Sequence, residues 1–281
     1  MKRSLVTLSL VAACLAAVGA SASAAGIGHH ATTHRTVIVQ DISIPVPGGA
    51  PVDAWLVRPD GPSAPRTLAG VIYLHWLEPP ASTQNRSEFL DEAVTVAEHG
   101  AVAILPDLTF PWTGTVNGDR RDVDAVKAQE RAIRVTYEKL LAQPGVDPTR
   151  TAVVGHDYGA MYGSLLAASE PNIRAEVYMS GDATWSNWFF NYFVDLPPAA
   201  LSAYNALFKG LDPVDNVARL RSHLYLQWGD ADPFIAQDVR DAFSAANPQA
   251  KVSVYQGVDH FLDQSAKDDR IPWLLGQLGL G

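Results

Sequence analysis

The sequence of 281 residues contains a single cysteine, Cys14, close to its N-terminus. One thiol cannot form an intrachain disulfide, and beyond that terminus no cysteine is present to bind zinc or to act as a nucleophile. Basic residues are also few, since 21 Lys and Arg stand against 30 Asp and Glu, which gives a formal net charge of −9. Because an acidic protein repels nucleic acid and anionic membranes, we expect a small-molecule substrate and no nucleic-acid partner.

Sequence patterns that bind cofactors are missing as well. The chain has no glycine-rich phosphate-binding loop, no dinucleotide fingerprint and no cluster of residues spaced as metal ligands. His29, His30 and His34 lie near one another, but the surrounding residues 25–35 are small, polar and without periodicity. This composition predicts a disordered lead-in rather than a metal site. We expect no cofactor and no metal.

A hydrophobic run long enough to span a membrane, about 20 residues, is likewise missing. The longest apolar stretch, residues 5–18, is shorter; it follows Lys2 and Arg3 and precedes the small residues 22–24. This order is typical of a secretory signal peptide, which we predict at residues 1–24. The mature protein would then be secreted and extracytoplasmic, with no membrane attachment after cleavage and a charge two units more negative.

A lipid anchor is the alternative for this N-terminus. Residues 11–14, Val-Ala-Ala-Cys, resemble a lipobox, which would place a lipid on Cys14. The apolar run continues past Cys14, however, where a lipoprotein normally becomes polar. We therefore prefer cleavage of a signal peptide.

Residues 36–281 alternate short apolar runs with helical patterns, which predicts one α/β domain with a doubly wound, mostly parallel sheet. At 47% hydrophobic residues the chain can bury a full core, and no repeat or low-complexity linker divides it. The expected strands are residues 36–45, 51–57, 71–75, 101–106, 151–154, 175–179, 224–228 and 251–256, of which the first two form an antiparallel hairpin. The expected helices are residues 89–99, 123–143, a helix from 160 onward, 236–246 and 272–278.

A strand, a sharp turn and a helix meet at residues 155–159, Gly-His-Asp-Tyr-Gly. Glycines at both ends let the strand and the helix approach closely, while the central residue, Asp157, is held in a strained and exposed turn. Asp232 and His260 follow two later strands, at the carboxyl ends where parallel sheets bind ligands. We predict that Asp157, Asp232 and His260 form a catalytic triad. Asp230 and Asp182 remain alternative acids.

These motifs, with residues 74–79 (Leu-His-Trp-Leu-Glu-Pro) and 106–108 (Pro-Asp-Leu), resemble the α/β-hydrolase superfamily, and more closely its dienelactone-hydrolase-like branch. The resemblance covers residues 36–280 and implies the α/β-hydrolase fold, with Asp232 orienting and charge-balancing His260. The elbow Gly-x-Asp-x-Gly is similar to that of epoxide hydrolases and haloalkane dehalogenases, whereas other members carry Ser or Cys.

A carboxylate at the elbow needs no deprotonation at neutral pH, so the histidine is left for another task. Asp157 would attack an alkyl carbon of an epoxide or halide, and His260 would activate the water that hydrolyses the resulting ester. The N–H of Tyr158, with that of Trp76 or Leu77, would form the oxyanion hole. The Trp76 indole could also bind a halide or an epoxide oxygen, or simply pack.

Aromatic residues gather between the strand ending at 179 and the strand starting at 224. They predict a short lid at residues 183–210, in which Trp185, Trp188 and Tyr192 line the substrate pocket. Tyr192 is the first choice for the proton donor that epoxide opening needs. The hydroxyls of Tyr158 and Tyr204 are alternatives.

The hypothesis that follows is a secreted hydrolase that attacks small apolar electrophiles, epoxides or alkyl halides, through a covalent alkyl-enzyme. One alternative is a dienelactone-hydrolase-like ester or lactone hydrolase, in which His260 activates water and Asp157 only positions it. A second alternative is a catalytically silent member that binds a ligand in the aromatic pocket. A separation of Asp157 and His260 too large for a water bridge would favour the silent member. The sequence leaves the substrate and the oligomeric state open.

Overall fold

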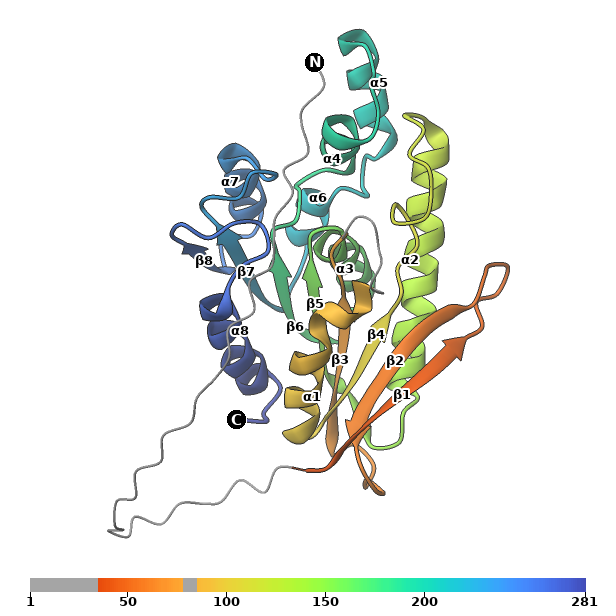
Figure 1. Cartoon of the computed structure of the whole chain (residues 1–281), viewed down its shortest axis with the longest axis vertical. Coiled ribbons are helices and arrows are strands. Elements are labelled where there is room, and N and C mark those ends of the chain that lie inside the picture. Colours follow the sequence, from red (N-terminus) through yellow and green to blue (C-terminus); the bar gives the residue numbers. More distant parts are fainter. Residues whose placement is uncertain (1–34, 78–84) are drawn as a thin grey trace, which may run out of the picture. The chain divides into compact units, whose positions relative to one another are not determined.

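The structure is a computed structural model that describes residues 35–77 and 85–281 (Figure 1). The predicted signal peptide, residues 25–34 of the predicted lead-in, and Glu78 and Pro79 of the 74–79 motif lie outside the described residues. Within the described ranges, no helix is both long enough and apolar enough to cross a bilayer.

An eight-stranded sheet forms the centre of the fold, with the order β1-β2-β4-β3-β5-β6-β7-β8. The β1–β2 and β2–β4 pairs are antiparallel and all other neighbours are parallel, which confirms the predicted hairpin and the mostly parallel sheet. The strands are β1 (Val37–Ile44), β2 (Val52–Pro59), β3 (Leu68–Leu74), β4 (Ala101–Pro106), β5 (Val146–His156), β6 (Ile173–Met179), β7 (His223–Gly229) and β8 (Lys251–Tyr255).

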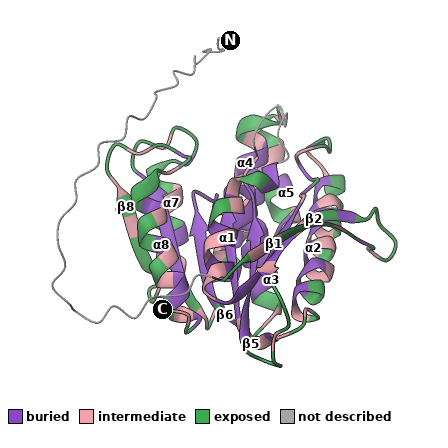
Figure 2. Ribbon diagram, turned by 60° about the horizontal axis from the view of Figure 1, so that its bottom comes forward, coloured by how far each residue is buried: buried purple, intermediate pink, exposed green. Residues whose placement is uncertain are grey.

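Helices cover both faces of this sheet. The 3₁₀ helix η1 (Asn85–Phe89), α1 (Leu90–Glu98) and α8 (Gln264–Gln277) pack on one face. The opposite face is covered by α2 (Arg120–Leu141), α3 (Tyr158–Ser169), α6 (Pro213–Val217) and α7 (Gln237–Ala246). Along β3, Val71 and Tyr73 join one core and Ile72 and Leu74 join the other, because successive side chains point to opposite faces. The central strands are therefore buried on both sides (Figure 2).

The predicted lid segment folds as two short helices, α4 (Trp185–Tyr192) and α5 (Pro198–Leu207), above the carboxyl ends of the strands (Figure 1). Thr184 begins α4 by accepting the N–H of Asn187 at 3.3 Å. The Tyr204 hydroxyl donates to Asp122 at 2.8 Å and ties α5 to α2. The segment is thus joined to the main domain at one end of the sheet.

The closing helix begins earlier than predicted. The sequence prediction places its start at Pro272. In the structure α8 begins at Gln264 and contains Pro272, and the carboxylate of Asp263 caps it by accepting the N–H groups of Ser265 and Ala266. The polar residues after Asp263 form the exposed first turns, so the hydrophobic pattern alone missed this start.

Candidate active site

Asp157 occupies a sharp turn between β5 and α3, with φ 56° and ψ −120°. A positive φ is strained for a residue other than glycine, and it turns the side chain away from both elements. A Cβ at Gly155 would collide with the backbone of Gly159, and one at Gly159 would collide with the carbonyl group of Leu74. The two glycines are therefore required for the close approach, and the predicted elbow geometry is present.

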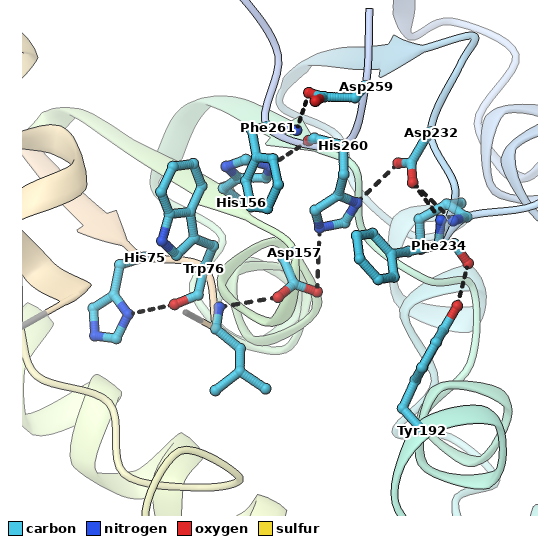
Figure 3. A network of polar contacts seen from close by, with 12 residues as sticks. His75, Trp76, His156, Asp157, Tyr192, Asp232, Phe234, Asp259, His260 and Phe261 are labelled. Atoms are coloured by element: carbon cyan, nitrogen blue, oxygen red, sulfur yellow. Dashed lines mark hydrogen bonds and ion pairs between the residues drawn. The ribbon is translucent and has the colours of Figure 1, made fainter. Parts of the chain in front are cut away.

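The Asp157 carboxylate is buried, with its two oxygens in different surroundings (Figure 3). Oδ2 accepts the backbone N–H of Leu77 at 3.0 Å, whereas Oδ1 is buried and has no hydrogen-bond donor among the described residues. Burial raises the pKa of Asp157 to about 7, although His260 and the N–H groups of Leu77 and Tyr158 oppose the shift. Asp157 can thus change its protonation state near neutral pH.

His260 lies in the loop after β8, between two carboxylates. Its Nδ1 is 2.9 Å from Oδ2 of Asp232, and its Nε2 is 3.9 Å from Oδ1 of Asp157. Oδ1 of Asp232 accepts the N–H groups of Phe234 and Ile235 at 2.7 and 3.0 Å. Burial raises the pKa of Asp232, but its contacts with His260 and these N–H groups outweigh burial and hold it below the usual range. The ring therefore donates Nδ1–H to Asp232 and directs Nε2 toward the elbow.

The two alternative acids have other partners. Asp230 accepts the N–H of Gly257 at 2.5 Å. Asp182 accepts the N–H of Thr184 and the side-chain amide of Asn187 at 2.9 and 2.6 Å, and burial raises its pKa to about 6. These contacts shape a turn and the start of α4. Asp232 is the carboxylate that the fold brings to the histidine.

Of the two backbone donors expected beside Tyr158, the structure brings Leu77 to the elbow. The N–H of Trp76 instead donates to Glu88 Oε2 at 2.8 Å and is not directed at Asp157. The Trp76 indole packs edge-on against His156 and Phe261, each at 5.0 Å between ring centroids. The indole Nε1 is buried and has no hydrogen-bond partner among the described residues, so the packing does not decide between the two roles considered for the ring.

Aromatic rings enclose the histidine. Trp188 of α4 stacks on His260 at 5.9 Å, and Phe234 and Phe261 approach it edge-on at 5.0 and 5.6 Å. The Tyr192 hydroxyl donates to the carbonyl of Phe234 at 3.0 Å, and the Tyr192 side chain is exposed. His260 itself is only 4% exposed. His260 therefore lies in an apolar shell that the lid segment helps to build.

Trp185 has a packing position rather than a place in this shell. It is fully buried, its ring packs against Tyr162 at 4.7 Å, and its indole N–H donates to the carbonyl of Leu211 at 3.0 Å. That Trp185 lines the substrate pocket stays a prediction, and its contacts show a packing role. Because a core ring and a pocket ring look alike in sequence, the aromatic cluster could not separate Trp185 from Trp188.

Sequence reasoning missed a second acid–histidine pair beside the elbow. The Nδ1 of His156 is 2.6 Å from Oε1 of Glu88, and its Nε2 is 2.9 Å from the carbonyl oxygen of His260. In the sequence His156 is only one residue of the elbow motif, and Glu88 belongs to no motif. Among the residues that the structure describes, no three His, Cys, Asp or Glu side chains are grouped to hold a metal ion.

Comparison with known proteins agrees with the observed fold. The model of the dienelactone hydrolase family matches residues 83–271. A structure from Klebsiella pneumoniae, assigned as a dienelactone hydrolase, is similar at 20% identity and a TM-score of 0.59, covering 87% of this chain and 99% of that one. An acetyl xylan esterase from Paenibacillus sp. R4 is similar at 12% identity and a TM-score of 0.67, over 89% and 86% of the two chains. A dienelactone hydrolase-like promiscuous phosphotriesterase from metagenomic libraries shows 17% identity and a TM-score of 0.55, over 84% and 89%. At these identities the three structures establish the fold.

Proposed function

Because the chain belongs to the dienelactone hydrolase family, and is therefore a hydrolase, we propose that it hydrolyses small, largely apolar esters or lactones at Asp157, His260 and Asp232. The observation that carries the proposal is the place of His260 between two carboxylates, 2.9 Å from Asp232 and 3.9 Å from Asp157. The similarity to an acetyl xylan esterase supports an ester as the substrate class.

In this proposal water is the nucleophile. Since Nδ1–H of His260 donates to Asp232, Nε2 is the basic nitrogen and takes a proton from water as the water oxygen attacks the acyl carbon. The same proton then passes to the departing alcohol or ring oxygen. The products are a carboxylic acid and an alcohol, or a hydroxy acid from a lactone.

Asp157 has a different task from the serine of related elbows. Its Oδ2 already accepts the N–H of Leu77, so this donor is not free for the substrate carbonyl. Its Oδ1 has no partner among the described residues, and with a pKa of about 7 it carries a proton in part of the molecules at neutral pH. We infer that the Oδ1–H donates to the substrate carbonyl oxygen and stabilises the charge that develops there.

The surroundings favour uncharged substrates. Trp188, Phe234 and Phe261 supply apolar surface around His260. Among the described residues that act on the pKa of Asp157, Glu88 adds a negative charge that raises it. A substrate that carries its own carboxylate would be repelled by Glu88 and by ionised Asp157.

A second candidate is the attack of Asp157 on an alkyl carbon. The observation that favours it is the arrangement of the carboxylate, with Oδ2 held by Leu77 and Oδ1 bare and buried. Oδ1 would form a bond to carbon as the carbon–halogen or epoxide C–O bond breaks. Water activated by His260 would then attack the carboxyl carbon of the Asp157 ester, the bond from that carbon to the alkyl oxygen would break, and the alcohol would leave with a proton as the carboxylate is regenerated. For an epoxide, Tyr192 would have to give up its hydrogen bond to Phe234 to protonate the leaving oxygen.

The silent alternative has the least support. A separation between Asp157 and His260 too large for a water bridge would favour it, and their side chains instead lie within 3.9 Å.

Two variants separate the two reactions. Asp157→Asn keeps a donor at the elbow but no nucleophilic oxygen anion, so it should retain measurable turnover of esters and lose all turnover of epoxides and halides. His260→Gln should lose both, and with an alkyl substrate it should trap a mass adduct on Asp157. Intact-protein mass spectrometry and a panel of esters, lactones, epoxides and halides give both readouts. Loss of ester turnover in Asp157→Asn, together with an adduct in His260→Gln, would overturn the first proposal in favour of the second.

A further inference from the structure

His156 lies beside Asp157 and His260 of the proposed site (Figure 3), and it forms a pair with Glu88. His156 ends β5 and precedes Asp157, while Glu88 belongs to η1. Both side chains are nearly inaccessible, at 1% exposure for His156 and 9% for Glu88. Buried ionisable groups need partners, and here both ring nitrogens have one.

The proton count of this pair follows from its contacts. The carbonyl of His260 can only accept a hydrogen bond, so Nε2 of His156 must carry a proton and donate it. At 2.6 Å, Nδ1 and the Glu88 oxygen must share another proton, because two lone pairs would repel at that distance. The pair thus holds two protons, as imidazolium with carboxylate or as imidazole with carboxylic acid. Its net charge is zero in either form, which burial tolerates best.

Glu88 also holds the loop that follows β3. Its Oε2 accepts the N–H of Trp76 at 2.8 Å, and the next N–H along the chain, that of Leu77, donates to Asp157. The backbone carbonyl of Trp76 also has a partner, since it accepts the indole N–H of Trp112 at 2.7 Å. The peptide groups around Trp76 are therefore fixed on both sides.

The contacts join into one path from Trp76 through Glu88 and His156 to the backbone of His260. The path connects the loop after β3, the elbow after β5 and the loop after β8, which carry Leu77, Asp157 and His260. We propose that Glu88 and His156 are positioning residues that set the place of His260 and of the Leu77 N–H relative to Asp157. Their effect on hydrolysis rests on the proposed function, while the shared proton can be tested without any substrate.

Two variants of His156 each keep one of its two hydrogen bonds and remove the other. His156→Gln places an amide nitrogen where Nε2 lies and can keep the contact with the His260 carbonyl, whereas His156→Asn places one where Nδ1 lies and can keep the contact with Glu88. Positioning of the base predicts a kcat loss on the order of 10- to 100-fold in His156→Asn, as for other residues that orient a catalytic group. The loss in His156→Gln should be clearly smaller, with KM little changed in both.

Glu88 offers a test by conservative rescue. Glu88→Ala removes the contacts with both Trp76 and His156 and should lower kcat as His156→Asn does. Glu88→Gln can accept from Trp76 and donate to a neutral His156, so it should recover most of the activity. Glu176→Gln is a matched control, because it alters a buried carboxyl group of β6 that contacts Ser222, and it should leave kcat unchanged.

Nuclear magnetic resonance of ¹⁵N-histidine-labelled protein tests for the shared proton between His156 and Glu88 without any substrate. The wild-type protein should show a strongly deshielded, slowly exchanging proton on Nδ1 of His156, and Glu88→Gln should abolish that signal. Absence of the proton in the wild type would overturn the shared-proton pair. Equal kcat in His156→Asn, His156→Gln and the wild type would overturn positioning while leaving ester hydrolysis intact. Lack of any ester turnover in the wild type, with the proton present, would instead count against the proposed function alone.

Discussion

Leu77 donates its backbone N–H to the Asp157 carboxylate at 3.0 Å, and so the elbow side chain fills a position that a substrate oxyanion would otherwise take. In an elbow with serine, the side chain is too short to do this and the N–H stays free for the substrate. Replacement of serine by aspartate therefore changes two things together, the nucleophile and the availability of the oxyanion donor. The first prediction follows from this double change.

The pH dependence of turnover should distinguish the two reactions. The pKa of Asp157 is raised by burial to about 7, so the acid form dominates below that pH and the carboxylate above it. Ester hydrolysis that uses the Oδ1–H should lose kcat/KM as pH rises through about 7, whereas alkyl attack by the carboxylate should gain it. Profiles of kcat/KM between about pH 5 and 9 measure the sign. In Asp157→Asn the limb near pH 7 should be absent from ester turnover, and its persistence would assign that limb to another group.

The acid that serves His260 should be Asp232 rather than its neighbour. Asp232→Asn cannot accept the Nδ1–H in the same way and favours the wrong ring tautomer, so kcat should fall on the order of 10³- to 10⁴-fold. Asp230→Asn is the matched control, because Asp230 contacts the N–H of Gly257 at the same turn. The Asp230→Asn variant should weaken the turn but keep kcat within a few-fold of the wild-type value. Comparable kcat losses in both variants would contradict the assignment.

Substitution of the two tryptophans of α4 should have different effects, on stability at Trp185 and on activity at Trp188. Trp185 is fully buried and hydrogen-bonded to Leu211, so Trp185→Phe should lower the free energy of unfolding by about 1 to 3 kcal/mol through the lost bond and packing. Trp188→Phe loses no hydrogen bond that the structure shows and retains a ring over His260, so it should mainly change KM among substrates of different size. Urea denaturation and steady-state kinetics on both variants measure the two effects. A larger kinetic change in Trp185→Phe would place that ring in the pocket after all.

The sequence predicts the elbow and the sheet well because both depend on local patterns. Continuous apolar runs mark strands buried on two faces, such as Ala101–Pro106, and paired glycines mark the close approach around Asp157. The start of α8 was missed because most residues that follow its cap, Asp263, are polar and give no clear apolar pattern. Glu88 was missed because its partners lie far away in sequence, and only the folded sheet brings it to His156.

A buried carboxyl group remote from the proposed chemistry should make stability depend on pH. Glu176 is fully buried on β6 and hydrogen-bonds Ser222, and burial raises its pKa from 4.5 to about 7. The folded protein thus holds a proton that the unfolded chain releases at lower pH. By linkage, the Glu176 contribution to the free energy of unfolding is intact below about pH 4.5 and falls as pH rises toward 7.

Glu176→Gln should remove this contribution, since the amide resembles the protonated acid and never ionises. The variant and the wild type should unfold with similar free energies at pH 5, and by pH 8 the variant should be more stable by up to about 3 kcal/mol, the equivalent of the pKa shift. Denaturant unfolding at the two pH values measures the difference. Glu92→Gln is the contrasting control, because Glu92 pairs with buried Arg270 at 2.9 Å and its neutralisation should destabilise the fold. A stability difference between Glu176→Gln and the wild type that does not grow with pH would show that Glu176 stays ionised in the folded protein.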